Sequence, residues 1–148
     1  MRHAIDDQPH RAPAGTGSRE DPRRALGRTG ERLAASHLER LGFAVIARNV
    51  FTRTGELDLI AFDGSSLVFV EVKTRRVRSG GGRIRPEQDP LPWLRPRQRA
   101  RLRRQAVAWL TDAGRTGPSA ETIRFDAIGV IVDGHENLVR LEHLEAAW

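Results

Sequence analysis

The chain has 148 residues, a net charge of +6 and a pI of about 11.3, so its length suits one domain with a real core and its basic balance suggests a polyanionic partner. No apolar run approaches the roughly 20 residues that a membrane helix needs, so no membrane partner is expected. The absence of cysteine excludes a disulfide framework, a thiolate nucleophile and a cysteine-based zinc site, and it agrees with a cytoplasmic location; the five histidines show no ligand spacing.

The N-terminal residues 1–23 are rich in Pro, Gly, Ser, Asp and Arg and carry few apolar side chains, so we expect a disordered tail. A folded domain is expected over residues 24–148. Its first helix is predicted from Arg24 to Leu41, because apolar residues recur there at steps of three and four, and Gly42 is a natural C-cap. Glu31 lies beside this apolar stripe, where in isolation it is typical of an exposed helix carboxylate paired with an arginine.

Three strands are expected to follow the helix. The apolar run from Phe43 to Val50 predicts the first strand, before a polar turn over residues 52–55. The stretch GELDLIAFDGSSLVFVEVKTR, from Gly55 to Arg75, predicts the second and third strands around a tight turn at Asp63-Gly64.

Charged side chains are set into this apolar hairpin at regular positions. Because strand side chains alternate between faces, Glu56 and Asp58 are expected to share one face of the second strand, and Glu71 and Lys73 one face of the third. The opposite faces are predicted to be core and carry Leu57, Leu59, Ala61, Val68, Val70 and Val72. If the two strands pair, three carboxylates and one amine gather on one patch of the sheet.

A basic block begins where the third strand ends. Arg75 to Arg104 holds eleven arginines against two acidic residues, which leaves the rest of the chain mildly acidic. The segment from Val77 to Pro92, rich in Gly and Pro, predicts a long substrate-facing loop. The helix predicted from Pro96 to Thr111 carries arginines outside its apolar stripe, and phosphates would relieve their repulsion, which favours nucleic acid over a merely solvated arginine-rich surface. The candidate nucleic-acid contacts are Arg75, Arg76, Arg97, Arg99, Arg101 and Arg104.

The rest of the chain adds a turn, a strong strand and a candidate strand. The turn is expected from Asp112 to Ser119, the strand from Ile123 to Val132, and the candidate from Leu138 to Leu144 after a turn at Asp133-Gly134. The element order is therefore α-β-β-β-α-β, with a further β if the candidate forms. This order predicts an α/β protein in which helices flank a mixed sheet.

Asp58, Glu71 and Lys73 together suggest metal-dependent phosphate chemistry. An Asp and a Glu suffice to hold Mg²⁺ (or Mn²⁺) beside a substrate phosphate, with the Val72 carbonyl as a further candidate ligand. Lys73 would then orient the attacking water or stabilise the charge on phosphorus. The competing interpretation is a set of solvent-facing ion pairs on a two-stranded ribbon. Lys73 is the single lysine beside 24 arginines, and a lysine pKa is tunable where that of arginine is not, which favours function.

Asp58, followed after twelve residues by Glu71-Val72-Lys73, resembles the PD-(D/E)xK motif of the restriction-endonuclease-like nucleases. A wider ordered pattern is more specific. It consists of Gly30-Glu31, Ala47-Arg48-Asn49, Gly55 to Ile60, Phe69 to Arg75 and Arg124-Phe125-Asp126. On this pattern the chain resembles the YraN-like family of small bacterial proteins over residues 25–148, and that family is similar in its core to archaeal Holliday-junction resolvases.

The resemblance implies a restriction-endonuclease-like, PD-(D/E)xK nuclease-like domain with four site residues. Asp58 and Glu71 would be metal ligands, and Lys73 would be the catalytic lysine. Glu31 would be the first-helix acid that resolvase-like enzymes bring to the metal, which reverses its isolated interpretation.

The resemblance also assigns supporting positions and one departure. Glu56 is expected at the strand start or behind the ligands, and Asp126 is expected to pack or pair structurally, with Arg124 or with an arginine of the active site as its partner. Gln98 stands where YraN-like proteins typically carry a lysine near the start of the second helix. If that lysine contacts phosphate, Arg97 and Arg99 would replace it. If it takes part in the chemistry, an arginine would not replace it, and activity would not be expected.

These features predict a nucleic-acid-binding endonuclease that hydrolyses DNA phosphodiester bonds with Mg²⁺ or Mn²⁺, with branched DNA as one candidate substrate. Two alternatives stay open. One is a module that retains the nuclease fold and binds nucleic acid without cutting, and the other is a scaffold whose basic block binds acidic protein. A homodimer is implied if the analogy with junction resolvases, which need two active sites, extends to assembly.

Overall fold

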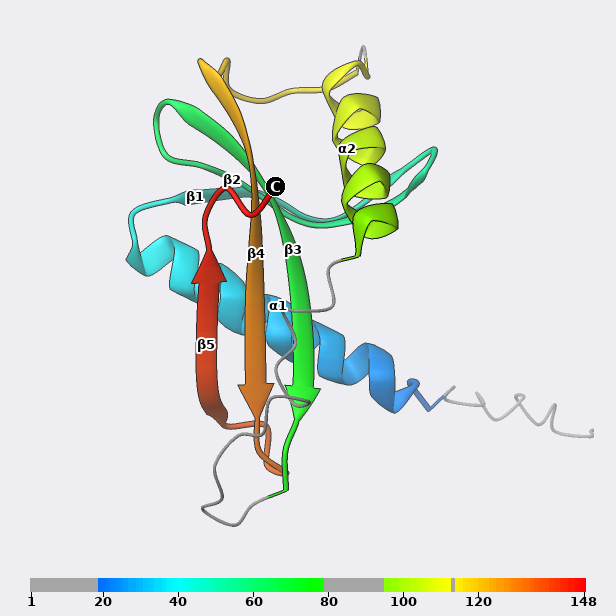
Figure 1. The fold of residues 1–148 in the computed structure, drawn as a ribbon, viewed down its shortest axis with the longest axis vertical. Coiled ribbons are helices and arrows are strands. Elements are labelled where there is room, and N and C mark those ends of the chain that lie inside the picture. Colours follow the sequence, from blue (N-terminus) through cyan, green and yellow to red (C-terminus); the bar gives the residue numbers. More distant parts are fainter. Residues whose placement is uncertain (1–18, 79–94, 113) are drawn as a thin grey trace, which may run out of the picture.

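The computed structural model describes residues 19–78, 95–112 and 114–148, and it arranges them as one sheet with a helix on each face (Figure 1). The elements are α1 (Pro22–Arg40), β1 (Ala44–Thr52), β2 (Gly55–Phe62), β3 (Ser66–Arg76), α2 (Pro96–Leu110), β4 (Thr122–Val132) and β5 (Leu138–Leu144). The predicted mixed sheet flanked by helices is confirmed, and the candidate strand after the Asp133-Gly134 turn does form. Most of the predicted tail, residues 1–18, and most of the predicted loop, residues 79–92, lie outside the described residues.

The five strands lie in the order β1-β2-β3-β4-β5. β1 to β3 form an antiparallel meander, β3 and β4 are parallel, and β5 returns antiparallel to β4. The parallel pair is long and regular, from Ser66 opposite Thr122 to Arg76 opposite Val132. Parallel neighbours require a long crossover connection, and α2 lies within it.

Helix α1 begins earlier than its apolar pattern indicates. The Asp21 side chain accepts a hydrogen bond from the Arg23 amide at 3.0 Å, and Pro22 occupies the first helical turn, where its missing N–H costs nothing. The predicted start at Arg24 therefore misses two helical residues, and the tail boundary at residue 23 falls inside α1. At the other end Gly42 adopts a φ of 93°, as a helix-terminating glycine does.

The core on the α1 face joins the helix to the centre of the sheet. Its buried members are Ala34, Ala35, Leu38, Leu59, Ala61, Val68, Val70, Val72, Ile128, Val130 and Val132. The even-numbered residues of β3 supply this face, as strand alternation predicts. The small alanines of α1 allow the helix to lie close against β3, which is the strand it contacts most.

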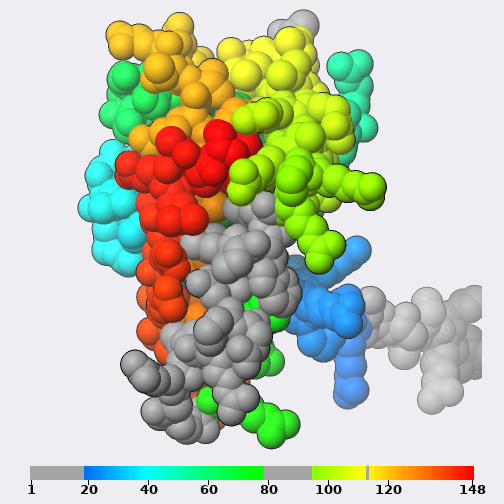
Figure 2. Space-filling model, in the orientation of Figure 1, coloured from blue at the N-terminus to red at the C-terminus, as the bar shows by residue number. Residues whose placement is uncertain are grey.

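The core on the α2 face is smaller and more aromatic. Its buried members are Leu57, Ile60, Leu67, Phe69, Leu102 and Ala106, and Trp109, Phe125 and Trp148 pack against them. Phe69, Phe125 and Trp148 form a continuous stack with ring centroids 5.7 and 5.8 Å apart. Figure 2 shows the C-terminal residues, in red, lying against α2. The last residues of the chain therefore help to cover this face.

Within the part of the chain that the structure describes, neither helix is both long and apolar enough to cross a membrane.

Candidate functional site

Asp58 lies where β2 separates from β3. The antiparallel pairs between the two strands run from Phe62–Leu67 to Leu59–Val70 and stop there. One residue further, the Asp58 carboxylate accepts a hydrogen bond from the Val72 amide at 2.8 Å. A side-chain oxygen thus satisfies the β3 amide after the pairing with β2 has ended, which fixes the carboxylate against the edge of β3.

The separation of β2 also changes which face its side chains occupy. Leu57, Leu59 and Ala61 are all buried, as predicted. However, Leu59 and Ala61 belong to the core on the α1 face, whereas Leu57 belongs to the core on the α2 face. The prediction that the three share one face is wrong for Leu57, because alternation holds only while the strand stays regular, and β2 leaves its partner at Asp58.

Glu71 and Lys73 lie on β3 at the point where β2 has separated. Glu71 is only 5% exposed, and its Oε1 lies 2.8 Å from the Lys73 Nζ. The single lysine of the chain therefore partners a buried carboxylate, which would otherwise be a costly isolated charge. This contact is compatible with the ion-pair interpretation, but the burial of Glu71 is not compatible with a solvent-facing pair.

Glu31 reaches the same region from α1. Its neighbour Gly30 lies directly on Thr74 of β3: a Cβ atom at Gly30 would overlap the Thr74 hydroxyl and come within 2.8 Å of the Thr74 Cβ and Cγ2. Only glycine allows the helix to lie this close to the strand. One carboxylate oxygen of Glu31, Oε2, is buried without a hydrogen-bond partner.

Asn49 supports Glu31 from β1. It adopts a φ of 49°, in the left-handed region that Asn tolerates better than most residues, and its side chain hydrogen-bonds to Glu31. Burial raises the pKa of Glu31, this hydrogen bond opposes the rise, and the charges of Glu56 and Glu71 add to it. Asn49 was part of the resemblance pattern, but the sequence carried no signal for its left-handed backbone.

The Asp58 carboxyl has the most altered acidity in the group. Burial is the largest cause and the charge of Glu71 the next; together with Glu31 they raise the pKa of Asp58 to about 8, against the opposing hydrogen bond from Val72. Without a cation at the site, these influences favour the protonated form of Asp58 well above its usual pH range. The charges of Glu71 and Glu31 both act on Asp58, so these residues of β3, α1 and β2 lie in one region of the structure, and their role as metal ligands stays a prediction.

The donor set fits a hard divalent cation. Carboxylate oxygens are the ligands that Mg²⁺ and Mn²⁺ prefer, and the unpartnered Glu31 Oε2 offers a further oxygen. Among the described residues, no group of three or more His, Cys, Asp or Glu side chains is arranged so that it could hold a metal ion. Mg²⁺ commonly uses one or two protein carboxylates and takes its other ligands from water and substrate, so Asp58 and Glu71 suffice.

The predicted arginines fall into two groups. Arg97, Arg99, Arg101 and Arg104 are carried by α2, and all four are exposed. On β3, Arg75 is partly buried, and Arg76 pairs with Glu136 at 3.1 Å. Gln98 has a structural role at the start of α2, where its Oε1 accepts a hydrogen bond from the Arg95 amide at 3.0 Å.

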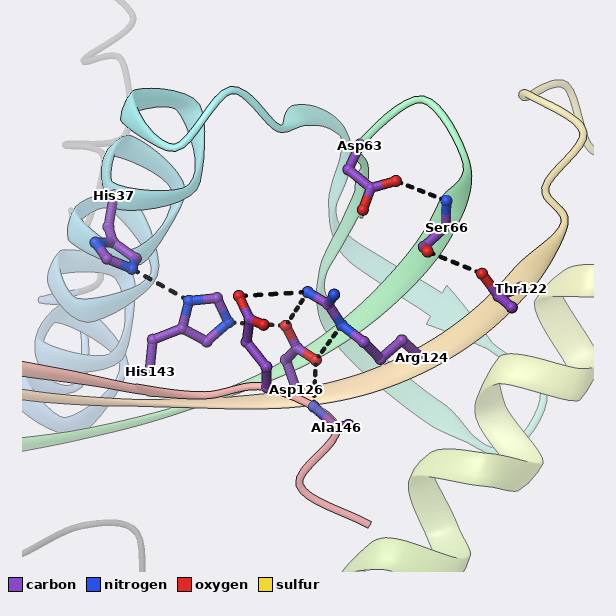
Figure 3. A network of polar contacts seen from close by, with 9 residues as sticks. His37, Asp63, Ser66, Thr122, Arg124, Asp126, His143 and Ala146 are labelled. Carbon is purple, nitrogen blue, oxygen red and sulfur yellow. Dashed lines mark hydrogen bonds and ion pairs between the residues drawn. The ribbon is translucent and has the colours of Figure 1, made fainter.

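A second polar network surrounds Asp126 of β4, which lies opposite Val70 of β3 (Figure 3). This buried carboxylate accepts two hydrogen bonds of 2.8 Å from Arg124, one of 2.7 Å from His143 and one of 3.0 Å from the Ala146 amide. The predicted structural pair of Asp126 with Arg124 is confirmed. His143 in turn lies 3.2 Å from His37 of α1, a contact for which the sequence offered no signal.

Comparison with known proteins gives a consistent family assignment. A model of the uncharacterised protein family UPF0102 matches residues 30–130. A UPF0102 protein of Acidothermus cellulolyticus is 46% identical over 125 residues, which is 80% of this chain and 87% of its own length. One of Pelotomaculum thermopropionicum is 41% identical over 128 residues, 86% of this chain and 98% of its own. One of Streptomyces griseus is 47% identical over 110 residues, 74% of this chain and 85% of its own.

Proposed function

The chain belongs to the uncharacterised protein family UPF0102, and on that basis we propose that it is a restriction-endonuclease-like protein that binds nucleic acid and hydrolyses DNA phosphodiester bonds with Mg²⁺ or Mn²⁺. One observation carries the proposal. Carboxylates from three separate elements lie in one region: buried Glu71 of β3 pairs with the only lysine of the chain, and the partly buried Asp58 of β2 and Glu31 of α1 are close enough for their charges to interact. A purely structural group of this kind would be expected to neutralise each carboxylate with a cation of its own.

The protein groups have distinct roles in this proposal. Asp58 and Glu71 would hold the metal, and Glu31 would complete the set with its unpartnered oxygen. The metal, when bound, supplies positive charge at the scissile phosphate. Lys73, whose Nζ already lies 2.8 Å from Glu71, would donate a hydrogen bond to the attacking water or to a non-bridging phosphate oxygen.

The surface around the site supports a polyanionic substrate. The arginines of α2 at positions 97, 99, 101 and 104 are uninterrupted by acidic residues. Each would contact phosphate oxygens without reading sequence, so binding should be general for DNA and sensitive to salt. The acidic carboxylates, by contrast, repel DNA unless a divalent cation lies between them and the phosphate.

The proposal predicts metal-dependent cleavage that requires Lys73. We expect the wild-type protein to cut duplex, single-stranded or four-way-junction DNA in Mg²⁺ or Mn²⁺, and Lys73→Ala to lower the rate by roughly 100-fold or more, as loss of one transition-state donor does. Lys73→Gln keeps a donor for buried Glu71 and separates loss of chemistry from loss of stability. Arg140→Ala removes an exposed cation that pairs with Glu142 on the edge strand β5 and is the matched control.

Two outcomes would reject the catalytic assignment. Cleavage at an unchanged rate in folded Lys73→Ala would remove Lys73 from the chemistry. Salt-dependent DNA binding without cleavage of any substrate would favour the non-catalytic binding module. For either function, log affinity should fall with log salt at a slope of about −0.9 per phosphate contacted, and a flat response would remove nucleic acid as the partner.

A further inference from the structure

Two pockets flank the hairpin formed by β1 and β2. The acidic pocket, of about 490 Å³, is lined by Glu31, Glu56, Asn49 and arginines of α1. The Trp109 pocket, of about 770 Å³, lies between the hairpin and the C-terminal end of α2. Among the described residues, Phe51 lines both pockets and is the only residue to do so. Its ring therefore lies between the cavity that Glu31 lines, together with Glu56, Arg24 and Arg28, and a second cavity.

Phe51 is exposed to a degree that folding does not explain. It is 81% exposed, the most exposed large apolar side chain and the only aromatic one among those so exposed in the described part of the chain. Burial of a phenylalanine side chain normally stabilises a folded protein, and at Phe51 the fold does not gain this stabilisation. Phe51 lies opposite Glu56 in the pairing of β1 with β2, which places the ring beside the carboxylates rather than at a remote edge.

The Trp109 pocket has the chemistry of an anion site with an aromatic wall. The Arg115 guanidinium carbon lies 4.8 Å from the centre of the Trp109 ring, and its Nη1 is buried without a hydrogen-bond partner. Arg53 also lines the pocket. The one carboxylate in the described lining, Asp112, already accepts a hydrogen bond from the Gly114 amide at 3.0 Å. Two guanidinium groups therefore outweigh one carboxylate, and one guanidinium N–H lacks an acceptor.

We propose that these features bind one unpaired nucleotide next to the site of cleavage. Its base stacks on Phe51, and its phosphate accepts hydrogen bonds from Arg115 and Arg53 in the Trp109 pocket, while the adjoining phosphodiester lies at the acidic pocket. This inference rests on the proposed function and narrows its substrate class. In an unbroken duplex both faces of each base are covered by neighbours, so Phe51 selects strand ends, flaps and branch points.

The test compares two DNA substrates under conditions in which cleavage cannot interfere. Binding is measured by fluorescence anisotropy with Ca²⁺ in place of Mg²⁺ and Mn²⁺, so that a cation still lies between the carboxylates and the phosphate, with a blunt duplex and with the same duplex extended by a short single-stranded flap that carries 2-aminopurine. The wild-type protein is expected to prefer the flap and to quench the 2-aminopurine. Stacking on an aromatic side chain is worth about 1–3 kcal/mol per base, so Phe51→Ala should weaken flap binding by about tenfold or more and leave duplex binding unchanged.

Further substitutions of Phe51 show whether the effect depends on a flat aromatic side chain. Phe51→Trp should retain the preference and the quenching, whereas Phe51→Leu, which keeps an apolar side chain without a flat face, should lose both. Val107→Ala removes another exposed apolar side chain, 57% exposed on α2, and is the control for a general effect. Equal wild-type affinity for both substrates, or a Phe51→Ala protein that keeps the flap preference, would overturn this inference alone. Failure to bind either substrate would overturn the proposed function as well.

Discussion

Asp58 shows how one side chain both shapes and charges the candidate site. Its carboxylate accepts a hydrogen bond from the Val72 amide at the point where β2 separates from β3, and this bond holds the side chain beside Glu71. The same position removes it from water and raises its pKa to about 8. The residue at which the strand pairing ends is therefore also the carboxyl group whose ionisation the fold opposes most, and a bound cation would remove this opposition.

Replacement of Asp58 by asparagine should stabilise the metal-free protein at high pH. The folded-state pKa of Asp58 lies above its ordinary value of 3.8, so its contribution to stability is complete below pH 3.8 and is lost as pH rises through about 8. Asparagine resembles the protonated acid: it accepts from Val72 and cannot ionise. Because one pKa unit corresponds to about 1.4 kcal/mol, a shift from 3.8 to about 8 allows at most about 6 kcal/mol, and we expect Asp58→Asn to be more stable than wild type by several kcal/mol at pH 9.

Urea unfolding in EDTA at pH 5, 7 and 9 measures this effect. The advantage of Asp58→Asn should grow with pH and be smallest at pH 5. A variant that is less stable than wild type at every pH would mean that Asp58 is an ordinary ionised carboxylate. Adding Mg²⁺ should stabilise the wild-type protein more than the variant, since a ligand that binds the folded state stabilises it.

At the residue scale, the predictable part of the site was the part that residue chemistry alone encodes. Asp58, Glu71 and Lys73 could be singled out because charged side chains are unusual within apolar strand sequences, and Lys73 is the single lysine of the chain. Phe51 could not, because an apolar residue in a strand is ordinarily buried, and only the structure shows this one exposed. The opposite faces taken by Leu57 and Leu59 depend on where one strand leaves another, which no local pattern encodes.

At the element scale, the contact between α1 and β3 decides whether Glu31 reaches the other carboxylates. The helix lies close to the strand at Gly30 over Thr74, one residue before Glu31. The apolar stripe of α1 predicted a docking face, and it predicted the face correctly. It did not predict the closeness of approach, because a glycine in a helix can equally lie at a position that nothing contacts, where it only weakens the helix.

Gly30→Ala should destabilise the protein, whereas Gly27→Ala should stabilise it. A methyl group at Gly30 would overlap Thr74, and overpacking of this kind costs typically about 1–3 kcal/mol. Gly27 lies in the same helix with no heavy atom within 4 Å of an added Cβ, so alanine there should gain roughly 0.5–1 kcal/mol from helix propensity. Denaturant unfolding of both variants provides the comparison. Equal shifts of the same sign would show that the close approach is absent.

The boundaries of the elements depended on capping rather than on periodicity. Asp21 and Pro22 start α1 before the first apolar residue of its stripe, so a prediction from the stripe alone began two residues late. Gln98, which departed from the expected lysine, caps the Arg95 amide at the start of α2. A residue that looked like a lost functional group therefore has a structural use, and this use does not depend on nucleic acid.

At the scale of the whole molecule, the network around Asp126 joins elements that are far apart in the chain. It connects α1 through His37, β5 through His143, β4 through Arg124 and the C-terminal segment through Ala146 (Figure 3). The candidate metal-site carboxylates draw on a different part of α1, at Glu31. Stability of the network and chemistry of the site are thus carried by different residues, and each can be changed separately.

The network predicts that the protein loses stability on mild acidification and that His37 carries part of this loss. Burial, with His143 and Arg40 nearby, lowers the pKa of His37 below its ordinary 6.5, so the folded state resists protonation there. The contribution of His37 is therefore complete above pH 6.5 and is lost as pH falls below it. Hydrogen bonds from His143, Arg124 and Ala146 outweigh burial and lower the pKa of Asp126, so its own contribution is lost only below about 3.8.

A single substitution can separate the pH range in which His37 affects stability from the range in which Asp126 does. His37→Gln keeps a polar group that reaches His143 and cannot titrate, so its Tm should fall less than that of wild type between pH 7 and pH 5, while both proteins should fall together below pH 3.8 as Asp126 is protonated. His135→Gln, in the exposed turn before β5, controls for the loss of a histidine side chain. A wild-type Tm that does not change between pH 7 and pH 5 would mean that His37 is protonated in the folded state without cost. In that case the contact between His37 of α1 and His143 of β5 would tolerate a charged imidazole, because the Asp126 carboxylate lies next to His143.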